Sequence, residues 1–299
     1  GSIGTIDRAV TIELIQSGAL SAMAPLSIYI SAPTGDLRIS EIITPQDAVL
    51  SARISVIALG GMVNITAKDV NITAIGGDVG SSDHKLVVST DVINVNAKGS
   101  IYIYAIGSIG LRELISQTGS VTLEAEGDIL SATTGSSLNL AGNTIDLISQ
   151  RGNIGTLSAP LNVRCNNISA VAVGVISIRA FSHMNIVRMA ASQKIYIAGV
   201  SLQGSNISTG LLELEVTGSV GTAKAPIGTS VQRVIIKAGK GVYLRNSGAL
   251  TIVTVSGTAV EIAANRITSA NASGYSVIAD SLKLTAANGI GDGKQKPLT

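Results

Sequence analysis

The chain has 299 residues, of which 45% are hydrophobic but only 2% aromatic, with no Trp and one Phe. Charged residues make up 13%, and the formal net charge of +2 predicts no strong basic field for binding nucleic acid. One cysteine, Cys165, excludes an intrachain disulfide, and we expect it to be a buried small hydrophobe. No apolar run reaches the roughly 18 residues of a membrane-spanning helix, so no membrane insertion is expected.

Apolar and polar residues alternate along almost the whole chain. Such alternation predicts strands with one buried face, built mainly from β-branched and other aliphatic residues. The nearest helical candidate, 111–116, is short and bordered by Gly, so the prediction is an all-β protein. In chain order, the expected strands are 63–67, 70–74, 92–97, 101–105, 121–125, 138–140, 145–147, 176–179, 195–197, 212–216, 234–236, 242–244, 260–262 and 282–284.

A short phrase, Gly-x-(Ile/Val)-Gly, recurs between the alternating stretches, with Pro160 and Pro226 behind two copies and Pro297 behind the related Gly289-Ile290-Gly291. Recurrence of one phrase is typical of a repeat architecture. We expect the glycines to allow positive φ at corners, the apolar residue to point inward, and the proline to begin the next extended segment. The predicted corner residues are Gly4, Gly80, Gly110, Gly152, Gly155, Pro160, Gly218, Gly221, Pro226 and Gly291.

Strand spacing alone would also suit a sandwich or a barrel. The aliphatic core, the scarcity of hairpin turns and the recurring phrase favour a right-handed parallel β-helix, or β-solenoid. With about 20 to 30 residues per coil, the chain would form about 10 to 15 coils and a rod of about 50 to 70 Å. We expect residues 1–299 to form a single domain, as a segment of a longer protein or as a filament subunit.

The phrases at Gly152–Thr156 and Gly119–Ile129 resemble the repeats of filamentous-haemagglutinin-like large bacterial exoproteins. The resemblance implies a secreted or cell-surface β-helix that serves as an adhesin shaft or extracellular filament. That family's amino-terminal secretion domain, with its Asn-Pro-x-Gly segments, has no counterpart in this chain. The family offers no catalytic residues to transfer.

β-Helical polysaccharide lyases and hydrolases are the rival class. These enzymes need clustered carboxylates, whereas Asp146, Glu213, Glu215 and Glu261 stand singly at alternating positions, as solvated charges would. The sequence therefore predicts no catalytic residue, no metal ligand and no cofactor.

The two histidines stand in dissimilar contexts. His84, beside Asp83, is expected in an exposed polar turn. His183 is expected at a corner or in the core. Neither has the spaced partners of a zinc site.

Two further groups of polar residues have structural and functional interpretations. Tyr102, Tyr104, Tyr196 and Tyr243 should face outward, where they would form a contact surface or simply cover aliphatic strand surface. Several Asn-x-Ser/Thr triplets, among them those at Asn64, Asn71, Asn167, Asn206 and Asn271, are interpreted as coincidence or as stacked structural ladders.

The predicted β-solenoid suggests two kinds of partner. The first expectation is copies of the chain, or neighbouring repeats, associating end to end. This would make the protein a self-assembling head-to-tail subunit of an extracellular fibre or sheath. A glycan or protein of a host or cell surface is the other expected partner.

Overall fold

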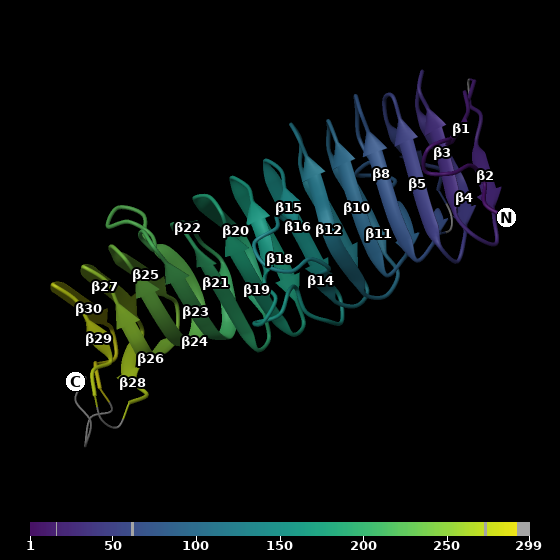
Figure 1. Ribbon diagram of the computed structural model, residues 1–299. Helices are drawn as coiled ribbons and strands as arrows, with labels where there is room; N and C mark the ends of the chain where they lie inside the picture. Colours follow the sequence, from purple (N-terminus) through teal and green to yellow (C-terminus); the bar gives the residue numbers. More distant parts are fainter. Residues whose placement is uncertain (16, 61–62, 272–273, 292–299) are drawn as a thin grey trace. The chain divides into compact units, whose positions relative to one another are not determined.

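The computed structural model describes residues 1–15, 17–60, 63–271 and 274–291. These residues contain thirty strands and no helix, and the strands stack in parallel as a β-solenoid of about 14 turns (Figure 1). The predicted fold class is thus confirmed. In this described part of the chain, no helix has the length and apolarity to cross a membrane. The chain divides into two compact units, Gly1–Asn153 and Ile154–Thr299, here called the N-terminal and C-terminal units.

The strands of the N-terminal unit are short and evenly distributed along its described residues. They are β1 (Val10–Thr11), β2 (Leu20–Met23), β3 (Ile28–Ala32), β4 (Leu37–Ile43), β5 (Asp47–Ala52), β6 (Val56–Ala58), β7 (Ile65–Thr66), β8 (Asp69–Ala74), β9 (Leu86–Ser89), β10 (Val92–Ala97), β11 (Ile101–Ala105), β12 (Ile109–Ser116), β13 (Val121–Ala125), β14 (Ile129–Ser131), β15 (Leu140–Ala141) and β16 (Thr144–Ser149).

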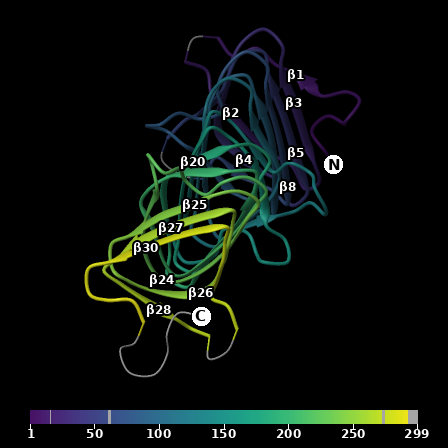
Figure 2. The same cartoon turned by 90° about the vertical axis from the view of Figure 1, so that its left-hand side faces the viewer.

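The C-terminal unit has some longer strands that bend around a corner. Its described strands are β17 (Leu161–Arg164), β18 (Asn167–Ala172), β19 (Val175–Ala180), β20 (Met184–Ala191), β21 (Lys194–Gly199), β22 (Leu202–Gly204), β23 (Ile207–Val216), β24 (Ile227–Ala238), β25 (Val242–Asn246), β26 (Ala249–Ser256), β27 (Ala259–Ala264), β28 (Arg266–Ser269), β29 (Val277–Ile278) and β30 (Ser281–Ala286). Figure 2 shows β25, β27 and β30 along one side of this unit's stacked coils and β24, β26 and β28 along another.

Register between coils puts like residues above like residues. In the C-terminal unit Ile176 lies opposite Ile195, which lies opposite Leu212, and all three are fully buried. In the N-terminal unit Leu50, Ile72 and Val95 form such a column, with at most 1% of each side chain exposed. The alternating pattern of the sequence therefore becomes continuous aliphatic columns inside the coil.

The buried hydrophobic core of the described residues contains no aromatic side chain. Ile, Val, Leu and Ala fill it, as the composition predicts. Cys165 is a free thiol with 5% of its surface exposed, and burial raises its pKa to about 12. The cysteine is therefore the buried small hydrophobe that the sequence predicts.

The first glycine of the recurring phrase is required by close approach, which corrects the expectation of positive φ at both glycines. Gly152 and Gly218 do not have positive φ. A Cβ on Gly152 would meet the carboxylate of Asp128 on the preceding coil, and one on Gly218 would meet the hydroxyl of Ser201. Only glycine leaves room for these polar side chains.

Polar side chains at this corner position bind the backbone of the next coil. Ser55 Oγ accepts from the Asp78 N–H (3.1 Å), Asp78 Oδ1 accepts from the Ser100 N–H (2.5 Å), and Ser100 Oγ accepts from the Ser120 N–H (3.1 Å). Ser55 and Asp78 are 23 residues apart, which is one coil. Asp78, Ser100 and Ser120 each follow a glycine, so the polar residue after the first glycine forms a hydrogen-bonded ladder along the corner, which Ser55 begins.

The second glycine adopts the left-handed conformation that the sequence predicts. Gly80, Gly155 and Gly221 have φ of +69°, +66° and +68°. After each comes a closed turn: the Thr222 and Ala225 N–H groups each donate to the other residue's carbonyl, at 3.0 and 3.1 Å. Pro226 then directly precedes β24, so the proline does begin an extended segment.

The phrase is less regular at other predicted corners. Gly4 (φ +69°) and Gly291 (φ +85°) match the second glycine, and Pro160 directly precedes β17. Gly110, however, has no positive φ and lies within β12, so its assignment as a corner is wrong. The phrase there is shifted by one glycine, because Gly107 takes the positive φ of +82°.

Truncating a core column should destabilise the fold. Ile103 is fully buried between Leu86 and Leu123, so Ile103→Ala should cost about 2 to 5 kcal/mol of unfolding free energy, from lost burial and a residual cavity. Urea unfolding followed by circular dichroism measures this. Thr122→Ala, on the outer face of β13, should cost less than about 1 kcal/mol, and equal losses would contradict the column.

A glycine at the left-handed position should resist substitution. Gly221→Ala would place a Cβ 2.7 Å from the Tyr243 carbonyl oxygen and impose a φ unfavourable to alanine, costing at least about 1 to 2 kcal/mol. Gly248→Ala is the matched control, since no atom lies within 4 Å of its Cβ position. The two melting temperatures compare them, and an unchanged value for Gly221→Ala would rule out this role.

Candidate functional site

The four tyrosines predicted as a contact surface are all partly exposed. Tyr102 and Tyr104 lie on the outer face of β11, where they alternate with fully buried Ile101 and Ile103. Tyr196 lies on β21 and Tyr243 on β25, each between buried aliphatic neighbours.

Register separates these tyrosines from one another. Tyr196 lies opposite Ser177 on one coil and Glu213 on the next, and Tyr243 lies opposite Glu261. The Tyr243 ring packs over Gly241, where a Cβ would meet the ring. Only Tyr102 and Tyr104 share a strand, so the structure forms no tyrosine ladder, and a contact role stays a prediction.

Tyr104 belongs to a polar cluster that connects several coils of the N-terminal unit. Its hydroxyl donates to Glu126 Oε1 (3.2 Å), while Lys85 Nζ lies 2.6 Å from Glu124 Oε2 and Gln150 Nε2 lies 2.7 Å from Glu124 Oε1. Desolvation and then the Glu126 charge raise the pKa of Tyr104. The hydrogen bond from Lys85 lowers the pKa of Glu124. These groups satisfy one another across coils, as a stabilising network does.

A shallow hollow of about 330 Å³ lies beside this cluster and includes Asp83, His84 and Lys85. His84 closes a turn in which its N–H donates to Ser81 Oγ (3.0 Å) and the Ser81 N–H donates to the His84 carbonyl (2.9 Å). This is the turn also seen at Thr222–Ala225. Both Asp83 and His84 are exposed, so the predicted polar turn is confirmed. Nowhere in the described residues do three His, Cys, Asp or Glu side chains gather to hold a metal ion.

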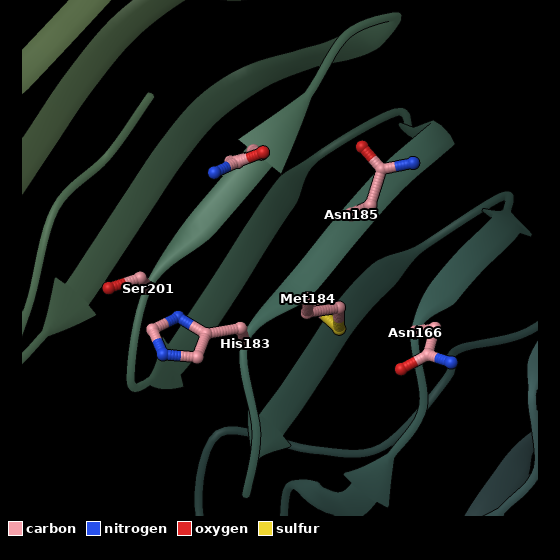
Figure 3. A pocket seen from close by; sticks show the side chains of 6 residues that line it. Asn166, His183, Met184, Asn185 and Ser201 are labelled. Atoms are coloured by element: carbon pink, nitrogen blue, oxygen red, sulfur yellow. The ribbon is translucent and has the colours of Figure 1, made fainter. Parts of the chain in front are cut away.

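A second hollow, of about 230 Å³, surrounds His183 in the C-terminal unit. Figure 3 shows the imidazole of His183 beside the Ser201 hydroxyl, with the amides of Asn166 and Asn185 farther along the same surface. His183 is exposed and directly precedes β20, so it is a corner residue and the core alternative is wrong. The Asn185 amide donates to Asn167 Oδ1 (2.8 Å) on the preceding coil, as stacked ladders do.

Asparagine side chains hold the places where one coil has an extra residue. Four register shifts interrupt the described pairings, after Ile39, Leu111, Ile186 and Ile252. Each leaves a bulged residue whose carbonyl is not used by the ladder. An asparagine amide donates to that carbonyl in every case: Asn64 to Ser40 (3.4 Å), Asn139 to Arg112 (3.3 Å), Asn206 to Val187 (3.0 Å) and Asn271 to Val253 (2.8 Å).

These asparagine clamps were missed by sequence reasoning. From the sequence, Asn64, Asn206 and Asn271 are interpreted only as parts of Asn-x-Ser/Thr triplets, whereas their amides bind carbonyls at bulges. Asn64 has 1% of its surface exposed, and its Oδ1 also accepts from the Val87 N–H (3.0 Å). The sequence signal for such a clamp is an isolated asparagine between two strands. It does not identify the bulge that the asparagine binds, because that bulge lies one coil earlier in the chain.

Comparison with known proteins adds nothing to this geometry: no protein-family model, curated protein or solved structure matches the chain.

Stability at acidic pH should depend on Glu124. Because its pKa is lowered in the folded protein, the charged carboxylate stabilises the fold above the ordinary glutamate value of about 4.3 and loses this contribution as the pH falls through the lower folded value. Urea midpoints measured from pH 6 to pH 3 should therefore fall more steeply for the wild type than for Lys85→Met. Glu124→Gln is the control without the titrating group. Identical pH profiles for all three proteins would contradict the coupling.

Proposed function

We propose that the chain is a non-catalytic structural segment, a shaft, of a bacterial secreted or cell-surface filament. The observation that carries this is the in-register stacking of coils within each unit, as in the Leu50–Ile72–Val95 and Ile176–Ile195–Leu212 columns. In such a stack each coil contacts only its neighbours, and each added coil extends it by about 4.8 Å at constant cross-section. A structure of this kind can hold two parts attached to its ends at a fixed distance from each other.

Ion pairs across coils support a structural role for the acidic side chains. Glu213 pairs with Lys194 on the preceding coil (2.5 Å) and Glu215 with Lys237 on the following coil (3.0 Å). Glu261 pairs in the same way with Lys283 (2.6 Å). These carboxylates are used one by one along the stack, whereas a glycoside-cleaving site requires two that converge.

The filament would be an extracellular adhesin. The phrase at Gly152–Pro160 resembles filamentous-haemagglutinin-like repeats, and Gly152, Gly155 and Pro160 each have a structural role at a corner. This supports an extracellular adhesin shaft of that type, built for length. Adhesion would then depend on a surface feature of the shaft or on a part attached to it.

Mechanical extension tests the shaft. The full chain is held at both ends in a single-molecule force experiment, and coils should be lost in small successive steps because each contacts only its neighbours. Deleting Val79–Ser100 removes 22 residues and one coil, since Ile101 lies in register with Val79. The variant should fold and release roughly 75 Å less extended chain.

Two outcomes would overturn the proposal. One is a single rupture that releases the whole chain at once, since a shaft built of neighbour contacts should yield stepwise. The other is turnover of a polysaccharide by the purified chain, detected as new reducing ends or unsaturated sugars.

The control for the one-coil deletion removes only Val79–Ser89. This half-coil deletion puts the following strands out of register and should prevent folding.

A further inference from the structure

The formal net charge of +2 conceals a division of charge between the two units. Residues 1–153 contain eight basic and fourteen acidic residues, a formal charge of −6. Residues 154–299 contain thirteen basic and five acidic residues, a formal charge of +8. The C-terminal unit therefore has a positive field of its own, which attracts anionic partners.

Several of its arginines remain without a counterion. The ion pairs of the C-terminal unit use Glu213, Glu215 and Glu261, all with lysines. Over the described residues, no carboxylate oxygen lies within 4.0 Å of the guanidinium of Arg188 or Arg245. Both side chains are exposed.

Arg188 and Arg245 lie along the same groove, which has a volume of about 600 Å³. The groove crosses successive coils, because Ala190 lies opposite Ser208, Ser208 opposite Ser230, and Gly228 opposite Arg245. Three coil steps separate the two arginines, or about 14 Å at 4.8 Å per step. The other lining residues are Ser205, Asn206, Ile207, Thr229 and Ser247.

The backbone itself shapes the groove. Arg188 follows the bulged residue Val187, whose carbonyl accepts from the Asn206 amide (3.0 Å). Asn206 is held at φ +60°, the only positive φ among the described non-glycine residues. Gly204, at φ +114°, packs directly against the Ile186 carbonyl, and Gly228 leaves the floor without a side chain. Such bulges and left-handed residues are typical of functional sites.

We propose that this groove binds an acidic polysaccharide, with Arg188 and Arg245 each pairing with a uronate carboxylate. A guanidinium fork matches a carboxylate through two parallel hydrogen bonds. The serine and threonine hydroxyls and the Asn206 amide supply donors and acceptors for sugar hydroxyls. The separation of the two arginines requires a chain with repeated charges. None of the groove's lining residues is aromatic, so it lacks the stacking platform that single-stranded nucleic acid requires.

Calorimetric titration of the full chain with oligogalacturonates tests this, at about 150 mM salt, where long-range attraction is screened. We expect saturable binding that weakens at least ten-fold in the double variant Arg188→Gln/Arg245→Gln. Ser230→Ile should also weaken binding, because it fills the groove and leaves both arginines in place. The matched control Lys224→Gln/Lys240→Gln removes the same charge from exposed turns and should bind within two-fold of the wild type. Melting temperatures verify that all variants fold.

Several outcomes of these experiments would contradict the proposal. Absence of saturable binding to oligogalacturonate overturns it, as does an equal loss of binding in the Lys224/Lys240 control. Tighter binding of single-stranded DNA or of a sulfated dextran than of oligogalacturonate also overturns it. So does light scattering that shows a dimer of the wild type but a monomer of the Arg188→Gln/Arg245→Gln variant, because a second copy would then be the occupant. None of these outcomes bears on the stepwise extension of the shaft, so the two proposals fail separately.

Discussion

The structure depends on one constraint: each coil must donate and accept its backbone hydrogen bonds in register with the coil before it. A coil that turned its corner one residue late would move its aliphatic side chains to the outer face. The ladder Ser55–Asp78–Ser100–Ser120 prevents this, because each side chain accepts from the backbone N–H at the equivalent point of the next coil. The glycine just before each donating N–H, such as Gly77 before Asp78, leaves the space that the accepting side chain needs.

Variation in coil length is absorbed at bulges and does not propagate. Where a strand carries an extra residue, an asparagine one coil later binds the carbonyl that the ladder leaves unused, as Asn139 does at Arg112 and Asn206 does at Val187. The aliphatic columns on either side continue without a change of phase. One of these bulges, at Val187, directly precedes Arg188, which lines the groove.

Two uses of charge follow from this architecture. Lys and Glu side chains that meet across coils, such as Lys194 and Glu213, neutralise each other along the stack. Arginines that stand beside small polar residues, such as Arg245 beside Gly228 and Ser230, have no such neighbour and remain available to a ligand. Within the described residues, the coils thus combine neutralised ion pairs with a groove that contains unpaired arginines.

The sequence by itself determined the all-β class, the aliphatic core and the solenoid, because a period of two and a lack of aromatic residues act locally and repeat in every coil. It did not reveal every strand, since none was predicted before residue 63, where the structure has β1 to β6. It also contained the opposite charges of the two halves, which the small net charge concealed. Only the tertiary structure decided why Gly152 must be glycine, which bulge Asn206 clamps, and that Arg188 and Arg245 share a groove. Each of these depends on contacts between residues one or more coils apart. Because coils differ in length, the register that brings such residues together exists only in the folded stack.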